Sequence, residues 1–154
     1  MMLYYFDSSA AAKRYTQETG SDWIKQIVEA EDEHTICFSQ IAVIEIAAAM
    51  SKKLRTKEID RETYNSALAL FLKDVADEAY LIAPITNATV DVAVDLTQRH
   101  PLRGYDAAHL ATAIILNKAT AESDNPPLVF VSADALLCKA AKEENLAVEN
   151  PNEH

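Results

Sequence analysis

Four acidic residues of this chain stand where a soluble protein usually places apolar side chains. Each either borders a short apolar run or interrupts a long one, and they are Asp7, Glu45, Asp106 and Asp134. Carboxylates are rarely buried unless a partner compensates them, because an uncompensated buried charge strongly destabilises a fold. We therefore expect the four acids to share one cleft and to hold a divalent metal ion there.

A cluster of carboxylates limits which ion it can hold. At a separation of about 4 Å and an effective dielectric constant of about 20, each pair would repel by about 4 kcal/mol, so a proton or a cation must relieve the cluster. Oxygen ligands suit Mg²⁺ or Mn²⁺, whereas zinc prefers His or Cys. Mg²⁺ held by a few carboxylates keeps positions open for water and phosphate oxygens. The acids thus predict metal-dependent hydrolysis of phosphodiester bonds.

Three of the acids also have a purely structural explanation. Asp7 could cap the N-terminus of a helix, which is worth about 1 kcal/mol, and Asp106 and Asp134 could do the same. Glu45 has no such role, because it is the only polar residue between positions 41 and 50. The other faces of that helix are apolar as well, so we expect the Glu45 carboxylate to lie inside the protein and to serve a function.

Short apolar runs alternate along the chain with helical patterns. Strands are expected at 2–6, 34–39, 79–83 and 128–132, with a short last strand at 146–148. Helices are expected from 7 or 8 to about 18, from about 20, from 39 to about 54, from a cap at Asp60, at 106–118 and at 133–145. The segment 89–96 alternates as a strand would, but its length and a cap at Thr86 favour a helix.

This order of elements predicts a parallel sheet. Strands separated by helices need crossover connections, which place helices on both faces of the sheet. Functional sites in such sheets form at the carboxyl ends of the strands, where Asp7 and Asp134 are expected. Asp106 is expected in the first turn of a helix, where the helix dipole favours an anion.

The composition is typical of one ordinary globular domain spanning residues 1–154. Apolar residues make up 49% and charged residues 25%, both common values for a folded protein. We expect neither a secretory signal nor a membrane span, because the apolar stretches are short and interrupted by acids. Cys37 and Cys138 have no CxxC pattern and no His partner nearby, so they are expected to be buried thiols in a reducing, cytoplasmic compartment.

The net charge of −10 argues by itself against a nucleic-acid partner, since phosphate binding needs clustered Lys or Arg. The bases are nevertheless gathered in two places: Lys52, Lys53, Arg55 and Lys57, and then Arg99, His100 and Arg103. The first cluster could equally complement the C-terminus of a helix. The second precedes a candidate catalytic acid directly, and it has more weight as a substrate contact.

The histidines do not support a different chemistry. His109 follows Asp106 by one helical turn, so it could hydrogen-bond near the site or simply be a satisfied core residue. The sequence contains no Ser–His–Asp or Cys–His pattern, no P-loop and no GxGxxG. Nucleophilic catalysis and nucleotide binding are therefore unsupported.

The acids and their surroundings resemble the PIN-domain family, and within it the VapC-like toxins of type II toxin–antitoxin systems. The matching segments are Tyr5-Phe6-Asp7-Ser8-Ser9-Ala10, residues 39–46 around Glu45, residues 102–113 around Asp106, Phe130-Val131-Ser132-Ala133-Asp134, and the closing residues 146–151. Each motif is weak alone, but their order and separations are fairly specific. The resemblance covers essentially the whole chain.

This resemblance implies an α/β/α sandwich with a central parallel sheet of four to five strands, and an endoribonuclease dependent on Mg²⁺ or Mn²⁺. Asp7, Glu45 and Asp106 match the three core metal-binding acids, and Asp134 matches a fourth, more variable one. Ser8 and Ser132 match hydroxyl positions that orient acids or metal-bound water, while Arg103 and His109 are further candidates near the site. The resemblance also implies a homodimer and a cognate antitoxin that covers the acidic pocket.

Other readings remain open at this point. A haloacid-dehalogenase-type phosphohydrolase needs a second Asp two residues after the first, and position 9 is Ser. A receiver domain needs an acidic pair and a Lys after a late strand, whereas Lys139 is expected inside a helix. A phosphohydrolase acting on another phosphoester and a catalytically silent interaction domain are the alternatives. Melting in the presence of Mn²⁺ or EDTA would separate the metal-binding readings from the silent one.

Overall fold

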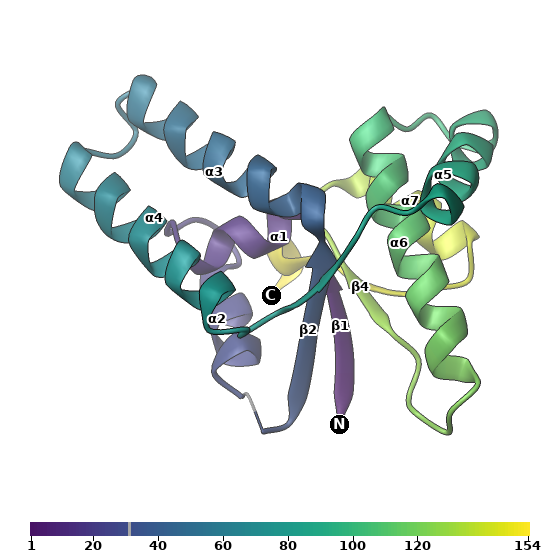
Figure 1. Ribbon diagram of the computed structural model, residues 1–154. Helices are drawn as coiled ribbons and strands as arrows, with labels where there is room; N and C mark the ends of the chain where they lie inside the picture. The colour runs from purple at the N-terminus through teal and green to yellow at the C-terminus, as the bar shows by residue number, and fades with distance from the viewer. Residues whose placement is uncertain (31) are drawn as a thin grey trace.

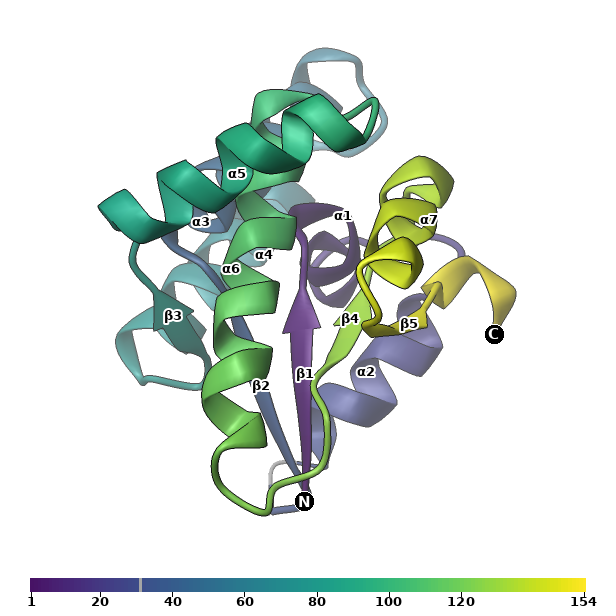
Figure 2. The ribbon, with the colours of Figure 1, turned by 90° about the vertical axis from the view of Figure 1, so that its right-hand side faces the viewer.

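A parallel sheet forms the centre of the computed structural model, which describes residues 1–30 and 32–154. Within this range the sheet consists of β1 (Met2–Phe6), β2 (His34–Ser39), β3 (Leu81–Ala83), β4 (Val129–Val131) and β5 (Ala147–Glu149). The strands lie in the order β3-β2-β1-β4-β5, and every neighbouring pair is parallel (Figures 1 and 2). The expected parallel sheet is confirmed, with five strands.

Helices connect the strands. The first crossover contains α1 (Ser8–Ala11), a 3₁₀ turn (Ala12–Arg14) and α2 (Ser21–Glu29). The later ones contain α3 (Gln40–Arg55), α4 (Arg61–Ala76), α5 (Asn87–Arg99), α6 (Gly104–Ala121) and α7 (Ala135–Glu143), and a 3₁₀ turn (Pro151–Glu153) follows β5. No helix of the described residues is long and apolar enough to span a membrane.

Strand side chains alternate between two cores, one on each face of the sheet. Phe6 and Phe38 enter the core formed with α1 to α4, whereas Tyr5 and Cys37 enter the core formed with α5 to α7 (Figure 1). The helices contribute Ala10, Ile24, Ile46 and Phe71 to the first core and Leu96, Leu110 and Leu137 to the second. The expected three-layer α/β/α sandwich is therefore confirmed. Cys37 and Cys138 are buried free thiols, as expected.

Local capping explains where several helices begin. The side chains of Asp7, Ser39, Asp60 and Asp134 each accept a hydrogen bond from a backbone N–H in the first turn of the helix that follows. Thr86 forms a reciprocal capping box with the residue three positions later. This box settles the ambiguous segment as α5, which is helical from 87 to 99.

The structure corrects some of the expected boundaries. The first helix ends near residue 14 rather than 18, because the Ser21 hydroxyl bonds both Glu18 N and Thr16 O and thereby turns the chain. Strand β3 begins at Leu81 rather than 79, since residues 77–79 complete hydrogen bonds to the end of α4. Helix α6 begins two residues before Asp106 and runs to Ala121.

Candidate active site

Asp7 accepts more side-chain hydrogen bonds than the other acids of the candidate site. It follows the carboxyl end of β1, and only 4% of its surface is exposed. Its Oδ1 accepts hydrogen bonds from Ser9 Oγ at 2.6 Å and from Ala10 N at 2.9 Å, and its Oδ2 accepts one from Ser132 Oγ at 2.6 Å. A carboxylate oxygen has two lone pairs, so Oδ2 keeps one for a cation.

The surroundings of Asp7 act on its pKa in opposite directions. Burial raises the pKa of this carboxyl above its ordinary value, while nearby His109 and the hydrogen bonds from Ser132, Ser9 and Ala10 hold the pKa down. The net direction is upward, so the anion at this position costs the fold free energy. A bound cation would relieve that cost, and a buried acid with a raised pKa is a common feature of functional sites.

Glu45 lies on α3 in the second turn after the Ser39 cap. Its Oε1 lies 2.6 Å from Nε2 of His109, and its side chain is 25% exposed. The expectation that Glu45 lies inside the protein is therefore only partly met. Helix α3 packs against the sheet through Ala42, Ile46 and Met50, so Glu45 sits at the border of the packed face.

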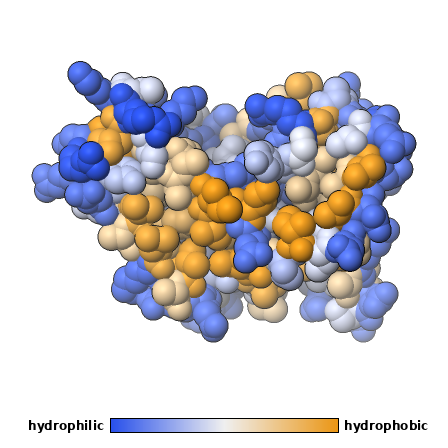
Figure 3. Space-filling model, turned by 45° about the horizontal axis from the view of Figure 1, so that its top comes forward, coloured by the Kyte–Doolittle hydropathy of each residue, from blue (hydrophilic) through white to orange (hydrophobic). Residues whose placement is uncertain are grey.

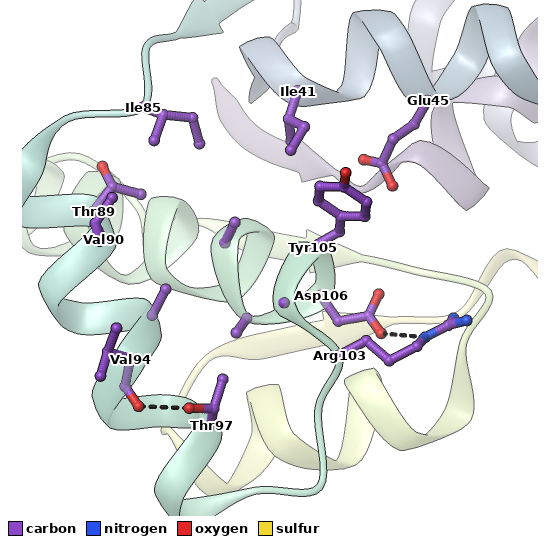
Figure 4. Close-up of a pocket in the computed structure, with 14 residues that line it drawn as sticks. Ile41, Glu45, Ile85, Thr89, Val90, Val94, Thr97, Arg103, Tyr105 and Asp106 are labelled. Atoms are coloured by element: carbon purple, nitrogen blue, oxygen red, sulfur yellow. Dashed lines mark hydrogen bonds and ion pairs between the residues drawn. The ribbon is translucent and has the colours of Figure 1, made fainter.

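Asp106 stands in the first turn of α6, where the helix dipole favours an anion. Its side chain is 21% exposed, and its Oδ2 lies 3.4 Å from Nε of Arg103. Asp106 and Glu45 line the same open cavity of about 800 Å³, together with Tyr105 and several apolar residues. Figure 4 shows the Glu45 carboxylate extending from α3 toward the side of the cavity that carries Tyr105 and Asp106.

Asp134 is linked to Asp7 through Ser132, and its side chain caps the N-terminus of α7. Its Oδ1 accepts hydrogen bonds from Leu136 N at 2.9 Å and Leu137 N at 3.1 Å. Its own backbone N–H donates to Ser132 Oγ at 3.0 Å, and that hydroxyl in turn donates to Asp7. Ser132 therefore joins the ends of β1 and β4, as expected for a hydroxyl that orients an acid.

Two residues that contact the site, Ser9 and Tyr5, were not assigned a role from the sequence. The hydroxyl that contacts Asp7 from the first turn of α1 is that of Ser9, while Ser8 is half-buried at the start of the helix. Tyr5 Oη lies 2.8 Å from His109 Nδ1, and Ser39 N donates to the same Tyr5 oxygen at 3.2 Å. The only sequence signal for these partners is a polar group at a buried position next to a candidate acid.

The acids thus lie toward one edge of the sheet, but they do not form the tight cluster that their sequence pattern predicts. Within residues 1–30 and 32–154, no three acidic, His or Cys side chains are close enough to hold a metal ion together. Asp7 is fixed by three donors, whereas Glu45 has one hydrogen-bond partner among the described residues, His109, and Glu45 and Asp106 both border an open cavity. The donors are oxygen atoms, which suit Mg²⁺ or Mn²⁺ in type.

The basic cluster before Asp106 is largely neutralised by acids. Arg99 pairs with Asp95 and Glu144, and His100 Nδ1 lies 3.1 Å from Glu143 Oε2. Of this cluster, Arg103 is therefore the residue that remains a candidate for contacting substrate, since it lines the cavity and is 86% exposed. In the other cluster, Lys53 pairs with Glu18 at 2.7 Å, and Lys52, Lys53 and Arg55 occupy the last turn of α3.

The fold and the acids define a class of protein, namely an α/β/α protein that gathers carboxylates at the carboxyl edge of a parallel sheet. The chain belongs to the PIN-domain family, whose sequence profile matches residues 4–129. This match contains Asp7, Glu45 and Asp106, whereas Asp134 lies beyond it.

Within the family the chain is VapC-like. It is 35% identical over 116 residues to Ribonuclease VapC45 of Mycobacterium tuberculosis strain CDC 1551 / Oshkosh, and equally to Ribonuclease VapC49 of strain ATCC 25618 / H37Rv. Each alignment covers 74% of this chain and 76% of the relative.

Two solved structures share the fold at lower sequence identity. VapBC2 from Rickettsia felis, crystallised with a DNA fragment from its promoter, matches with a TM-score of 0.66 and 18% identity over 97% of this chain and 98% of the other. PAE2754 from Pyrobaculum aerophilum matches with a TM-score of 0.65 and 17% identity over 99% of this chain and 91% of the other. At these identities the comparison supports the fold alone.

Proposed function

We propose that this protein is an endoribonuclease dependent on Mg²⁺ or Mn²⁺ and that it acts as the toxin of a type II toxin–antitoxin pair. The observation that carries the proposal is the placement of Asp7, Glu45 and Asp106 at one edge of the sheet in a PIN-domain chain. The VapC ribonucleases among its relatives support RNA as the substrate. Residues 1–154 would act as one nuclease unit in the cytoplasm, with no role for a membrane.

Asp7, Glu45 and Asp106 would hold the metal ion, each through an oxygen that keeps a free lone pair. Asp7 is already oriented by its three donors, so it would serve as the fixed point of the site. Glu45 would contribute Oε2, since its Oε1 is bonded to His109. Asp134 would support the site indirectly: its backbone N–H holds the Ser132 hydroxyl, and its carboxylate would bind the ion weakly. When bound, the ion lowers the pKa of a water molecule and stabilises negative charge on the phosphate.

The residues around the acids would position the substrate. Arg103 is held only loosely by Asp106 and is exposed at the cavity, so it can turn toward a phosphate oxygen. Ser132 and Ser9 keep the Asp7 carboxylate from rotating when the substrate arrives. Binding of RNA by a chain with a net charge of −10 would depend on the metal ion and on the few free bases.

Protein partners would cover the apolar rim of the cavity. Large apolar side chains are exposed around it or next to it, namely Ile44, Ile85, Val90, Val94 and Tyr105. Figure 3 shows apolar surface extending as a band across the hollow between two hydrophilic ends. Exposed apolar patches of this kind mark interaction sites. We assign them to a cognate antitoxin, by analogy with the VapBC2 structure, and to a second copy of this chain.

The direct test is cleavage of RNA by the purified protein with Mg²⁺ or Mn²⁺. We expect cleavage that EDTA abolishes, and we expect Asp7→Asn and Glu45→Gln to lower its rate by at least about a hundredfold, because a metal ligand matters more than the groups around it. Asp22→Asn is the matched control, since Asp22 is exposed on α2. Full activity of a folded Glu45→Gln protein would contradict the assignment of the ligands.

A further inference from the structure

His109 connects the candidate metal site to the interior of the protein. Its side chain is 1% exposed, yet both ring nitrogens have polar partners. Nε2 lies 2.6 Å from Glu45 Oε1 on α3, and Nδ1 lies 2.8 Å from Tyr5 Oη on β1. The ring therefore bridges elements from both cores of the sandwich.

The chemistry of the partners sets the direction of these hydrogen bonds. An ionised carboxylate only accepts, so the hydrogen atom on Nε2 points to Glu45. In a neutral imidazole Nδ1 is then an acceptor, and the Tyr5 hydroxyl donates to it. The Tyr5 oxygen in turn accepts a hydrogen bond from Ser39 N at 3.2 Å. A continuous chain of donors thus runs from the backbone at the end of β2 to the carboxylate of Glu45.

Packing holds this chain in place. The Tyr5 ring stacks on Phe130 with ring centroids 5.5 Å apart and an interplanar angle of 7°, and it meets the His109 ring edge-on at 6.0 Å. Glu45, by contrast, borders a cavity of about 800 Å³ and has no other hydrogen-bond partner among the described residues. Without His109, nothing in the described structure would fix the orientation of this carboxylate.

We propose that His109 is a positioning residue that orients Glu45 for metal binding, and that Tyr5 fixes the tautomer and the orientation of the His109 ring. This inference rests on the proposed function, in which Glu45 is a metal ligand. Outer groups that orient metal ligands typically change affinity or activity by about 10- to 100-fold when they are removed.

Three variants test the proposal. His109→Leu removes both hydrogen bonds, whereas His109→Gln keeps a carbonyl oxygen for Tyr5 and an N–H for Glu45 at a similar spacing. Tyr5→Phe keeps the ring stack and removes only the hydroxyl. Titration with Mn²⁺, followed by electron paramagnetic resonance, should show affinity weakened about 10- to 100-fold in His109→Leu and largely restored in His109→Gln. The turnover number for RNA should fall with affinity, whereas KM for RNA should stay near that of the wild type.

The tautomer provides a readout that needs neither metal nor substrate. Long-range ¹H–¹⁵N spectra of the metal-free protein should show the His109 ring with its hydrogen on Nε2. Tyr5→Phe should perturb the Nδ1 signal and weaken Mn²⁺ binding by a smaller factor than His109→Leu. Tyr4→Phe is the matched control, because Tyr4 is the neighbour of Tyr5 on β1 and contacts His34 on the other face of the sheet. It should change neither the spectrum of His109 nor the affinity.

The outcomes separate the inference from the function on which it rests. A wild-type protein that neither binds Mn²⁺ nor cleaves RNA would overturn the proposed function, while the His109 spectrum would still report on the hydrogen-bond chain. An active wild type with unchanged affinity in folded His109→Leu would overturn the inference alone. So would a His109→Gln protein that loses as much affinity as His109→Leu. If His109→Leu does not fold, Tyr5→Phe and His109→Gln decide the question.

Discussion

At the scale of single residues, both tasks of Asp7 favour its ionised form, whereas its burial opposes that form. As the cap of α1 it accepts a backbone N–H, and as a candidate ligand it must stay ionised in a place with 4% of its surface exposed. Burial raises its pKa, which means that the ionised form lowers the stability of the fold. A bound cation would offset this loss of stability, as expected if Asp7 is a metal ligand.

The raised pKa of Asp7 predicts a pH dependence of stability. The folded protein binds the Asp7 proton more tightly than the unfolded chain, so this contribution is complete below about pH 4, the unfolded value, and is lost as pH rises through the folded pKa. In metal-free buffer, Asp7→Asn should therefore gain stability relative to the wild type as pH increases from about 4 to 7. Urea unfolding at several pH values measures the difference.

Asp60 is the matched control for that prediction. It also caps a helix, but the backbone N–H of Thr63 lowers its pKa, so its ionised form is favoured in the folded state. That stabilising contribution is already nearly complete at about pH 4 and is lost only at lower pH, so the stability difference between Asp60→Asn and the wild type should stay nearly constant from about pH 4 to 7. If the two variants showed the same slope, the raised pKa of Asp7 would be contradicted.

At the scale of elements, the predictable features were those with local causes. Caps at Asp60 and Asp134 begin the helices as expected, because one side chain and the next turn suffice to form each cap. The residue at which an element ends depends more on contacts with distant parts of the chain. The first helix stops early because Ser21, well beyond it, bonds the chain at residues 16 and 18.

Helix α2 depends on a residue whose role only the structure reveals. Gly20 precedes this helix with φ at +85°, and a Cβ atom there would lie 2.4 Å from Pro151 O. Gly20→Ala should therefore destabilise the fold by about 2–4 kcal/mol, through the left-handed backbone and the clash together. Gly104→Ala is the control, since a Cβ at that position meets nothing within 4 Å. Equal unfolding midpoints in denaturant for the two variants would contradict the predicted clash between residue 20 and Pro151.

At the scale of the whole molecule, the sandwich followed from the order of strands and helices, whereas the contacts across it did not. The sequence predicts Asp7 and Asp134 just beyond the carboxyl ends of two parallel strands, and the structure has them after β1 and β4. The bond between Tyr5 and His109 joins residues 104 positions apart, and it depends on how α6 packs on β1. The partial exposure of Glu45 likewise depends on which face of α3 meets the sheet. Neither the Tyr5–His109 contact nor the partial exposure of Glu45 can be predicted from a local sequence pattern.

The most direct test of the account is the position of a bound ion. Crystals grown with Mn²⁺ should give an anomalous difference peak at the cavity, bonded to oxygen atoms of Asp7, Glu45 and Asp106, with the contact between Glu45 Oε1 and His109 Nε2 retained. The geometry of oxygen ligands around such an ion is well known, so the assignment would be clear. An ion that binds elsewhere, or no bound ion at saturating Mn²⁺, would contradict the claim that these acids form a metal site.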